Sequence, residues 1–207
     1  MTKKIMICLI LLCVGLWASI QEAYQAWQNG DMANAVRKYE EACYSGDMAG
    51  CHALGTLYFQ GSGVAQNYSM SASYYNKACE GNFEPSCNSL GVLYHYGLGV
   101  RQDFNFALSL YDRACKAGYA RGCNNVGAMF EEGLGVKQNY KQAGLYYADA
   151  CLVKDDRACF NLAQLLAKGR GVKKDKKRAM EYYGLSCDLG FQEGCDEYKE
   201  LKLKESK

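Results

Sequence analysis

The sequence predicts an all-α protein, an α/α superhelical solenoid built from stacked helix pairs. Three observations predict it: cysteines that recur at a fixed period, apolar residues at helical spacing, and glycines at the same place in every period. Such periodicity is typical of a supersecondary unit that buries its apolar face against its neighbours. An apolar content of 49% and a charged content of 22% indicate a globular chain rather than a disordered one.

The first segment, residues 1–19, is interpreted as a cleaved signal peptide. Residues 2–4 include two lysines and form a positive start, and the apolar run at 5–17 is shorter than the roughly 20 residues of a spanning helix. We therefore expect an exported protein, periplasmic or secreted, with no stable membrane insertion after cleavage. Lipidation at Cys13 is disfavoured because a large residue precedes it. Cleavage removes Cys8 and Cys13, and the ten cysteines that remain are typical of a disulfide framework.

The remaining cysteines define the repeat. They come in pairs whose first members are 36 residues apart, and the second member always follows the first by 8 residues. Cutting at each second cysteine predicts four repeats with no insertion between them. The predicted segments are an opening helix pair at 20–50, repeats at 51–86, 87–122, 123–158 and 159–194, and a charged C-terminal cap helix at 195–207.

Each repeat is predicted to hold two helices. The first carries apolar residues three, six and seven positions after the cysteine, which is helical spacing, and ends at a glycine suited to a left-handed conformation. A second glycine, a valine and then an N-cap residue follow, and the second helix turns a tyrosine inward. The terminal glycines are Gly61, Gly97, Gly133 and Gly169; the caps are Asn67, Asp103, Asn139 and Asp175; the tyrosines are Tyr75, Tyr111, Tyr147 and Tyr183.

The spacing of eight favours one disulfide pairing. Eight residues of continuous helix rise about 12 Å, whereas bridged Cα atoms lie within about 7 Å, so a turn must interrupt each pair. A rival pairing within a hairpin, such as Cys51 with Cys79, stays open but leaves Cys43 and Cys195 as orphans. The favoured bridges are Cys43–Cys51, Cys79–Cys87, Cys115–Cys123, Cys151–Cys159 and Cys187–Cys195.

The unit as a whole resembles a known repeat. An apolar-Gly-x-x-Tyr segment, then Gly-x-Gly-Val, then Asn or Asp, then a helix ending Ala-Cys is similar to the Sel1-like repeat, a relative of the tetratricopeptide repeat. The cysteines at a spacing of eight make the chain resemble the Helicobacter cysteine-rich protein family over residues 21–200. The resemblance implies an exported, disulfide-bridged solenoid. Members of that family are described as penicillin-binding proteins or slow β-lactamases, and Sel1-like repeats more broadly hold proteins or peptides.

The residues themselves supply no enzyme motif. A serine β-lactamase needs a lysine three positions after its nucleophilic serine, and Ser73 and Lys77 are four apart. His52 and His95 occupy different positions of different repeats, which argues against a shared metal. The absence of Cys-x-x-Cys argues against zinc and against redox chemistry. We therefore nominate no catalytic residue, metal or cofactor. Hydrolysis of a β-lactam to a substituted β-amino acid is the alternative function, implied by the resemblance alone.

Binding is the function we predict. A solenoid presents one helix face per repeat as a concave surface, and positions two, five and nine after the cysteine lie opposite the apolar stripe. The expected ligand is a peptide, a protein or a peptidoglycan-like fragment, and the resemblance implies β-lactams as a further ligand. The protein is expected to be a monomer. A net charge of +2 without a basic block argues against nucleic acid, and Lys173, Lys174, Lys176 and Lys177 are interpreted as a solvated loop. The predicted site residues are Ser89, Tyr96, Asn125, Glu132, Asn161, Gln164 and Lys168.

Overall fold

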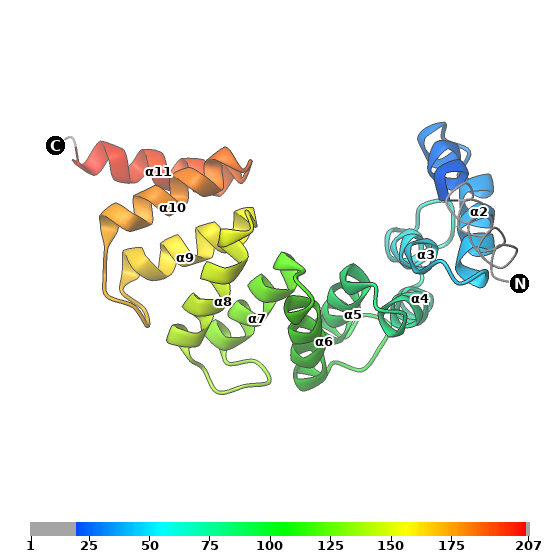
Figure 1. Cartoon of the computed structure of the whole chain (residues 1–207), viewed down its shortest axis with the longest axis horizontal. Helices are drawn as coiled ribbons and strands as arrows, with labels where there is room; N and C mark the ends of the chain where they lie inside the picture. Colours follow the sequence, from blue (N-terminus) through cyan, green and yellow to red (C-terminus); the bar gives the residue numbers. More distant parts are fainter. Residues whose placement is uncertain (1–19, 206–207) are drawn as a thin grey trace, which may run out of the picture. The chain divides into compact units, whose positions relative to one another are not determined.

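The computed structural model describes residues 20–205, and the predicted signal peptide lies outside them. The described part of the chain is helical throughout, with no strand (Figure 1). It divides into two compact units, Met1–Gln102 and Asp103–Lys207, here called unit 1 and unit 2. Each unit is described by itself.

The described part of unit 1 opens with a helical segment at residues 20–28 and continues with four further helices. Its helices are α2 (Met32–Tyr44), α3 (Met48–Gln60), α4 (Tyr68–Glu80) and α5 (Glu84–Tyr96). Those of unit 2 are α6 (Phe104–Lys116), α7 (Ala120–Glu132), α8 (Tyr140–Leu152), α9 (Asp156–Lys168), α10 (Lys176–Asp188) and α11 (Gln192–Glu205).

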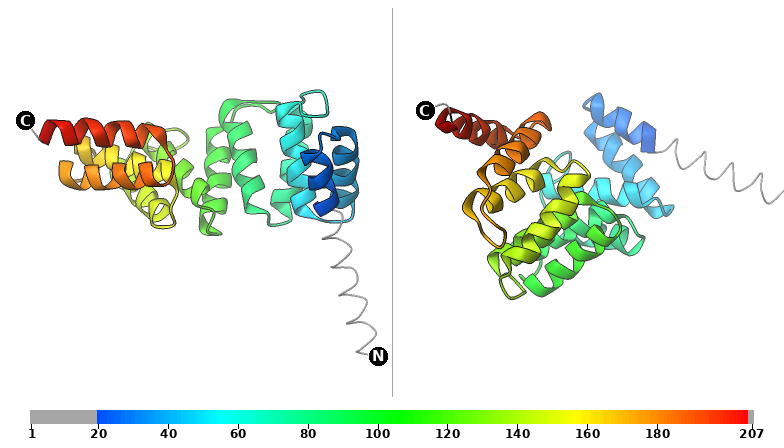
Figure 2. Two further views of the ribbon diagram at one scale, coloured as in Figure 1. Left: turned by 90° about the horizontal axis from the view of Figure 1, so that it is seen from above. Right: turned by 60° about the vertical axis from the view of Figure 1, so that its left-hand side comes forward.

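Consecutive helices pack against one another within each unit, and α9, α10 and α11 lie side by side in two views (Figures 1 and 2). In the repeat, α3, α5, α7 and α9 are the first helices, and α4, α6, α8 and α10 are the second helices. The predicted all-α solenoid of helix pairs is therefore confirmed.

The predicted helix ends are also confirmed. The cap carboxylates and amides accept hydrogen bonds from the first turn of each second helix, as Asn67 Oδ1 does from the N–H of Met70 at 3.0 Å. Each first helix ends at a left-handed glycine with φ between 67° and 76°. The other caps are Asp103, Asn139 and Asp175, and the glycines are Gly61, Gly97, Gly133 and Gly169.

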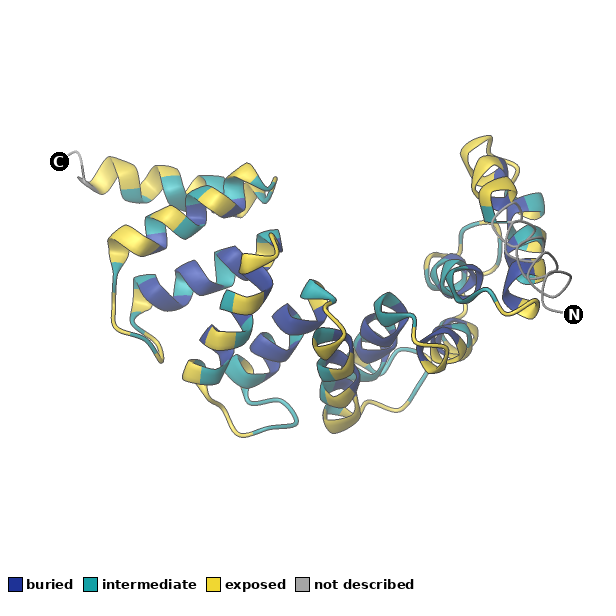
Figure 3. Cartoon of the chain, in the orientation of Figure 1, coloured by how far each residue is buried: buried dark blue, intermediate teal, exposed yellow. Residues whose placement is uncertain are grey.

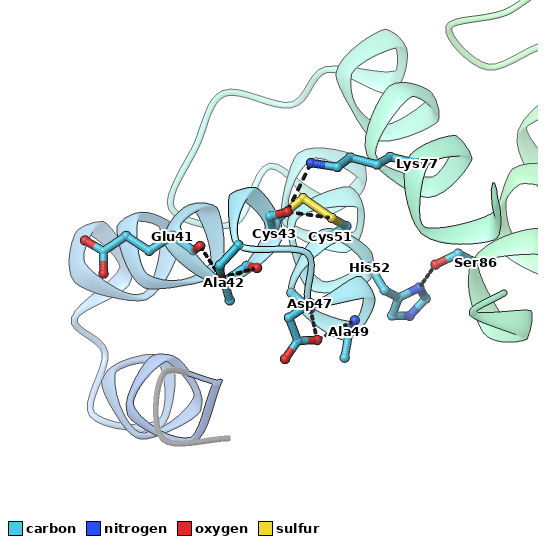
Figure 4. The surroundings of a disulfide bond; sticks show 11 residues. Glu41, Ala42, Cys43, Asp47, Ala49, Cys51, His52, Lys77 and Ser86 are labelled. Atoms are coloured by element: carbon cyan, nitrogen blue, oxygen red, sulfur yellow. Dashed lines mark hydrogen bonds between the residues drawn. A yellow bond between two sulfur atoms is a disulfide. The ribbon is translucent and has the colours of Figure 1, made fainter. Parts of the chain in front are cut away.

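All five disulfides join cysteines eight residues apart, with Cα–Cα distances of 4.5–4.7 Å. The rival pairing of Cys51 with Cys79 is wrong. Each first helix begins three residues before the second cysteine, so the bridge crosses the turn that enters the helix. Figure 4 shows the bridge between α2 and α3, where Lys77 of α4 also donates to the carbonyl of Cys43 at 3.0 Å.

The core follows the predicted tyrosine column. The rings at positions 75, 111, 147 and 183 are only 1–4% exposed, and buried positions occupy the facing sides of the helices (Figure 3). In the α3–α4 and α7–α8 pairs the first helix approaches this ring through a glycine: a Cβ on Gly55 would lie 2.5 Å from the ring of Tyr75, and one on Gly127 would lie 2.6 Å from that of Tyr147. Glycine at these positions therefore permits the close packing of the two helices in a repeat.

The second glycine of each loop controls how repeats stack. Gly99 and Gly171 have φ values of 67° and 65°. A Cβ on them would lie 2.3 Å from the carbonyl carbon of Tyr68 and 2.4 Å from that of Tyr140. Each loop thus rests on the first residue of the second helix of the preceding repeat, where only glycine fits.

Candidate binding surface

Two of the seven predicted site residues lie in unit 1, both on α5. Ser89 is half-buried and its hydroxyl donates to the carbonyl of Pro85 at 3.0 Å. Tyr96 ends the helix, 64% exposed, with its ring 4.5 Å from that of His95. Seven residues of helix separate them, a rise of about 10 Å, so they offer two separate contacts rather than one cluster.

Unit 2 brings amide side chains together. Asn161 of α9 donates from Nδ2 to Oδ1 of Asn124 on α7 at 2.9 Å. Asn124 is 9% exposed, whereas Asn161 is half-buried. Asn125 and Gln164 stand beside them on the same two helices, both half-buried. We call Asn124, Asn125, Asn161 and Gln164 the amide cluster.

Sequence reasoning missed Asn124, which lies one position after its cysteine rather than two. A signal for it exists, because Asn88 stands 36 residues earlier at the same position of the repeat and is also buried, at 8% exposure. Buried amides recurring at one position of a solenoid need polar partners on each occasion. The recurrence of asparagine at the position directly after the second cysteine could therefore have identified Asn124 from the sequence.

Charged residues lie at the ends of the same two helices. Lys168, exposed at the end of α9, donates from Nζ to Oε1 of Gln164 at 3.2 Å, so this predicted pair is in contact. Glu132 is exposed at the end of α7. The helices that carry the amide cluster therefore end in one acidic and one basic side chain.

A buried tyrosine fixes a second carboxylate on α7. The Tyr147 hydroxyl donates to Oε2 of Glu131 at 2.9 Å, and a guanidinium nitrogen of Arg170 lies 3.9 Å from Oε1. Burial, followed by the charge of Glu131, raises the pKa of Tyr147, so the hydroxyl keeps its proton and remains a donor at neutral pH. Glu131 lies two turns after Asn124, on the same face of the helix.

Unit 1 contains a serine–histidine contact that has the chemistry of a nucleophile and a base. His52 Nδ1 lies 2.8 Å from Ser86 Oγ (Figure 4), and burial lowers the pKa of His52, which favours the neutral imidazole. Ser86 is 0% exposed, however, and a nucleophile must reach its substrate. The contact therefore joins α3 to α5 as a structural hydrogen bond.

Other site types have no support in residues 20–205. No group of three or more His, Cys, Asp or Glu side chains there is placed to hold a metal ion. Within the same range, no helix has both the length and the apolar character needed to cross a membrane.

The repeats match a known family. The Sel1 repeat model matches residues 49–83, 85–119, 120–152 and 156–191, so the chain belongs to the Sel1 repeat family. Helicobacter pylori cysteine rich protein B is 32% identical over 62% of this chain and 92% of its own, with a TM-score of 0.50. With the five disulfides, this likeness supports a cysteine-rich Sel1-like protein of the Helicobacter type, as the resemblance implied.

Two further structures share the architecture. A protective antigen of uropathogenic Escherichia coli, c5321, is 26% identical over 86% of this chain, with a TM-score of 0.80, and the chain spans 39% of its length. A Sel1 repeat protein from Oxalobacter formigenes is 27% identical over 84% of this chain and 72% of its own, with a TM-score of 0.74. No curated protein matches the chain significantly. Five disulfides fit an extracellular or periplasmic protein.

Proposed function

We propose that the chain is an exported binding protein that holds an extended peptide segment on the amide cluster of unit 2. Sel1 repeats suggest protein binding in general, and the hydrogen-bonded pair of Asn124 and Asn161 is the observation that carries the assignment. Export through residues 1–19 and action as a monomer are parts of the proposal.

The chemistry of the cluster matches a peptide backbone. A side-chain amide carries one acceptor oxygen and an NH₂ donor, the same groups that an extended chain offers. Asn161 uses its NH₂ group on Asn124, and its oxygen has no protein partner among the described residues. No side-chain oxygen or nitrogen of that part of the chain is both buried and unsatisfied. The Asn161 oxygen is therefore open to solvent and can accept a hydrogen bond from a ligand N–H.

Two amides of the cluster are oriented before a ligand binds. Asn124 and Asn161 stand on α7 and α9, and the hydrogen bond between them fixes the orientation of these two amides. Preorganised donors and acceptors lose little conformational entropy on binding. Glu132 and Lys168 then offer opposite charges for side chains of the peptide. A cell-wall peptide presents the same backbone groups and belongs to the same proposal.

The test is selection of random linear peptides displayed on phage against the oxidised full chain, followed by calorimetry of a selected peptide. Asn161→Ala should weaken binding about tenfold, the loss expected for one hydrogen bond of about 1.4 kcal/mol. Asn105→Ala, on the exposed surface of the second helix α6, is the matched control and should bind like the wild type. Failure to select any peptide, or equal affinities for the two variants, contradicts the proposal.

The alternative implied by the resemblance, slow hydrolysis of β-lactams, stays a prediction. The serine–histidine contact in unit 1 is closed to substrate because Ser86 is buried. All ten cysteines of residues 20–205 are in disulfides and cannot act as nucleophiles. The binding function is therefore the one that the geometry favours.

A further inference from the structure

The loop between α9 and α10 differs from its three counterparts in charge. Residues 168–178 contain seven basic residues and one acidic residue. The equivalent stretches are uncharged at 60–70, carry one of each sign at 96–106, and carry two lysines and one glutamate at 132–142. Because the backbone of the four loops follows one pattern, the charge is a property of this loop and not of the fold.

These side chains face solvent. Arg170, Lys173, Lys174, Lys176, Lys177 and Arg178 are all exposed, and we call them the basic edge. Among residues 20–205, no carboxylate lies within 4.0 Å of the side-chain nitrogens of the four lysines. The two arginines have neighbours in unit 2: Arg170 lies 3.9 Å from a carboxylate oxygen of Glu131 and over the Tyr140 ring at 5.6 Å. Arg178 lies over the Tyr182 ring at 5.9 Å.

The fold is not stabilised by this charge. Lys176, Lys177 and Arg178 form the first turn of α10, where the helix dipole disfavours cations. Asp175 offsets only part of this unfavourable interaction, since it is one carboxylate beside three cations and it accepts the backbone N–H of Arg178 at 3.0 Å. Like charges crowded at one place also repel one another. Four lysines that repel one another and have no carboxylate within 4.0 Å among residues 20–205 point to a partner outside the unit.

The edge extends to the preceding repeat. A Cβ on Gly171 would lie 2.5 Å from the backbone nitrogen of Lys141, so the loop rests directly on the start of α8. The α7–α8 and α9–α10 loops lie along the same side of unit 2 (Figure 1). Lys141, which is exposed, therefore continues the row of cations beyond one loop.

We propose that the basic edge binds an anionic polysaccharide, a chain of sulfated or phosphorylated sugars. Short segments rich in Lys and Arg are typical of heparin-like and other polyanion sites, because each contact releases a condensed counterion. A membrane surface fits less well, since peripheral binding usually buries apolar side chains as well. Val172, the apolar residue of this loop, packs into the core instead. This inference is independent of the peptide site.

The test measures binding of the oxidised full chain to a heparin oligosaccharide at several salt concentrations. The triple variant Lys173→Gln, Lys174→Gln, Lys177→Gln should bind at least about tenfold more weakly at low salt, and the slope of log affinity against log salt should fall by about 2. Its matched control, Lys199→Gln, Lys202→Gln, Lys204→Gln on α11, removes the same charge and should stay within about twofold of the wild type. Neutral dextran should not bind.

Three outcomes overturn the proposal. One is no binding of heparin by the wild type at low salt. Another is an equal loss of heparin affinity in the two triple variants, which would show that binding depends on net charge and not on the basic edge. The third is binding of phosphatidylglycerol vesicles or duplex DNA as tightly as heparin with the same dependence on the basic edge, which would assign the surface to a lipid or to a nucleic acid. Thermal unfolding checks that both variants are folded.

Discussion

The two units share one backbone pattern and differ in what their first helices and loops present to solvent. In unit 1 the exposed side chains include the aromatic rings of Tyr24 and Trp27, stacked with centroids 5.9 Å apart, and of Tyr96. In unit 2 the first helices carry the amide cluster, and one loop carries the basic edge. The buried tyrosine, the capped second helix and the cysteine pair recur in both.

The difference separates positions that make the fold from positions that meet a partner. The inward tyrosine, the loop glycines and the cysteine pairs recur at the 36-residue period in both units, because each is fixed by a contact that every repeat must make. The last residue of the first helix changes from Tyr96 in unit 1 to Glu132 and Lys168 in unit 2, while these helices keep the same length of 13 residues. In a solenoid, exposed positions that vary between repeats are therefore candidates for contact with a partner.

The largest expected effect comes from replacing the second loop glycine in each unit, which tests whether Gly99 and Gly171 are equivalent. Gly99→Ala and Gly171→Ala each place a Cβ against backbone at a residue with positive φ, so each should lower the free energy of unfolding by about 3–4 kcal/mol. Gly118→Ala is the control, since its φ is +90° but nothing lies within 4 Å, and should cost about 1 kcal/mol. Denaturant titration measures all three. A mild effect in one unit alone would contradict the equivalence.

Removing one disulfide per unit should give the next largest effect. The pair Cys79→Ala, Cys87→Ala in unit 1 and the pair Cys151→Ala, Cys159→Ala in unit 2 should each cost about 2–3 kcal/mol, because both bridges close equally short loops. Hydrogen exchange should show the loss of protection around the altered turn. If removal in one unit lowered protection equally in the other, the units would not be separate in stability.

The smallest expected effect is a pH dependence of stability that differs between the units, because both histidines of the chain, His52 and His95, lie in unit 1. Burial lowers the pKa of His52, so the unfolded chain takes up the proton more readily as the pH falls through about 6.5. Unit 1 should therefore be more stable above this pH and lose stability below it. His52→Asn, which installs the residue found at positions 88 and 124, should flatten this dependence.

Tryptophan fluorescence is the measurement for that prediction. Trp17 lies in the predicted signal peptide, and Trp27 lies in the helical segment at residues 20–28 of unit 1. The fluorescence of Trp27 in the chain without residues 1–19 therefore follows unit 1. Denaturation midpoints at several pH values should rise with pH for the wild type and stay level for the variant. An unchanged slope in His52→Asn would place the pH dependence elsewhere in unit 1.

Much of the fold could be predicted because local chemistry repeats four times. Gly61 predicts the end of one helix and Asn67 the start of the next. The spacing of eight between Cys43 and Cys51 requires a turn between the two cysteines if they are bridged. The start of the first helices was harder to place. Asp47 and Asp155 cap them with side-chain hydrogen bonds, but Phe83 and Tyr119 hold the same position without one.

The candidate site was less predictable, because it depends on which side chains of neighbouring repeats come into contact. Asn161 was chosen from its spacing, but its partner Asn124 was not, since contact between α7 and α9 follows from the packing of repeats. The four lysines of the basic edge were interpreted as a solvated loop. Arg170 and Arg178 stand beside these lysines in the sequence itself. The contact of the loop with the start of α8 depends instead on the close approach of Gly171, which the sequence does not reveal.

The disulfides between residues only eight apart have a consequence for how the chain is made. Each bridge needs only its own turn, so the contacts that define the fold have low contact order, and a cysteine meets its partner soon after both have been synthesised. Pairing can proceed vectorially from the amino-terminal end, one helical hairpin at a time. A chain assembled in this way has little need of an isomerase to correct mispaired cysteines.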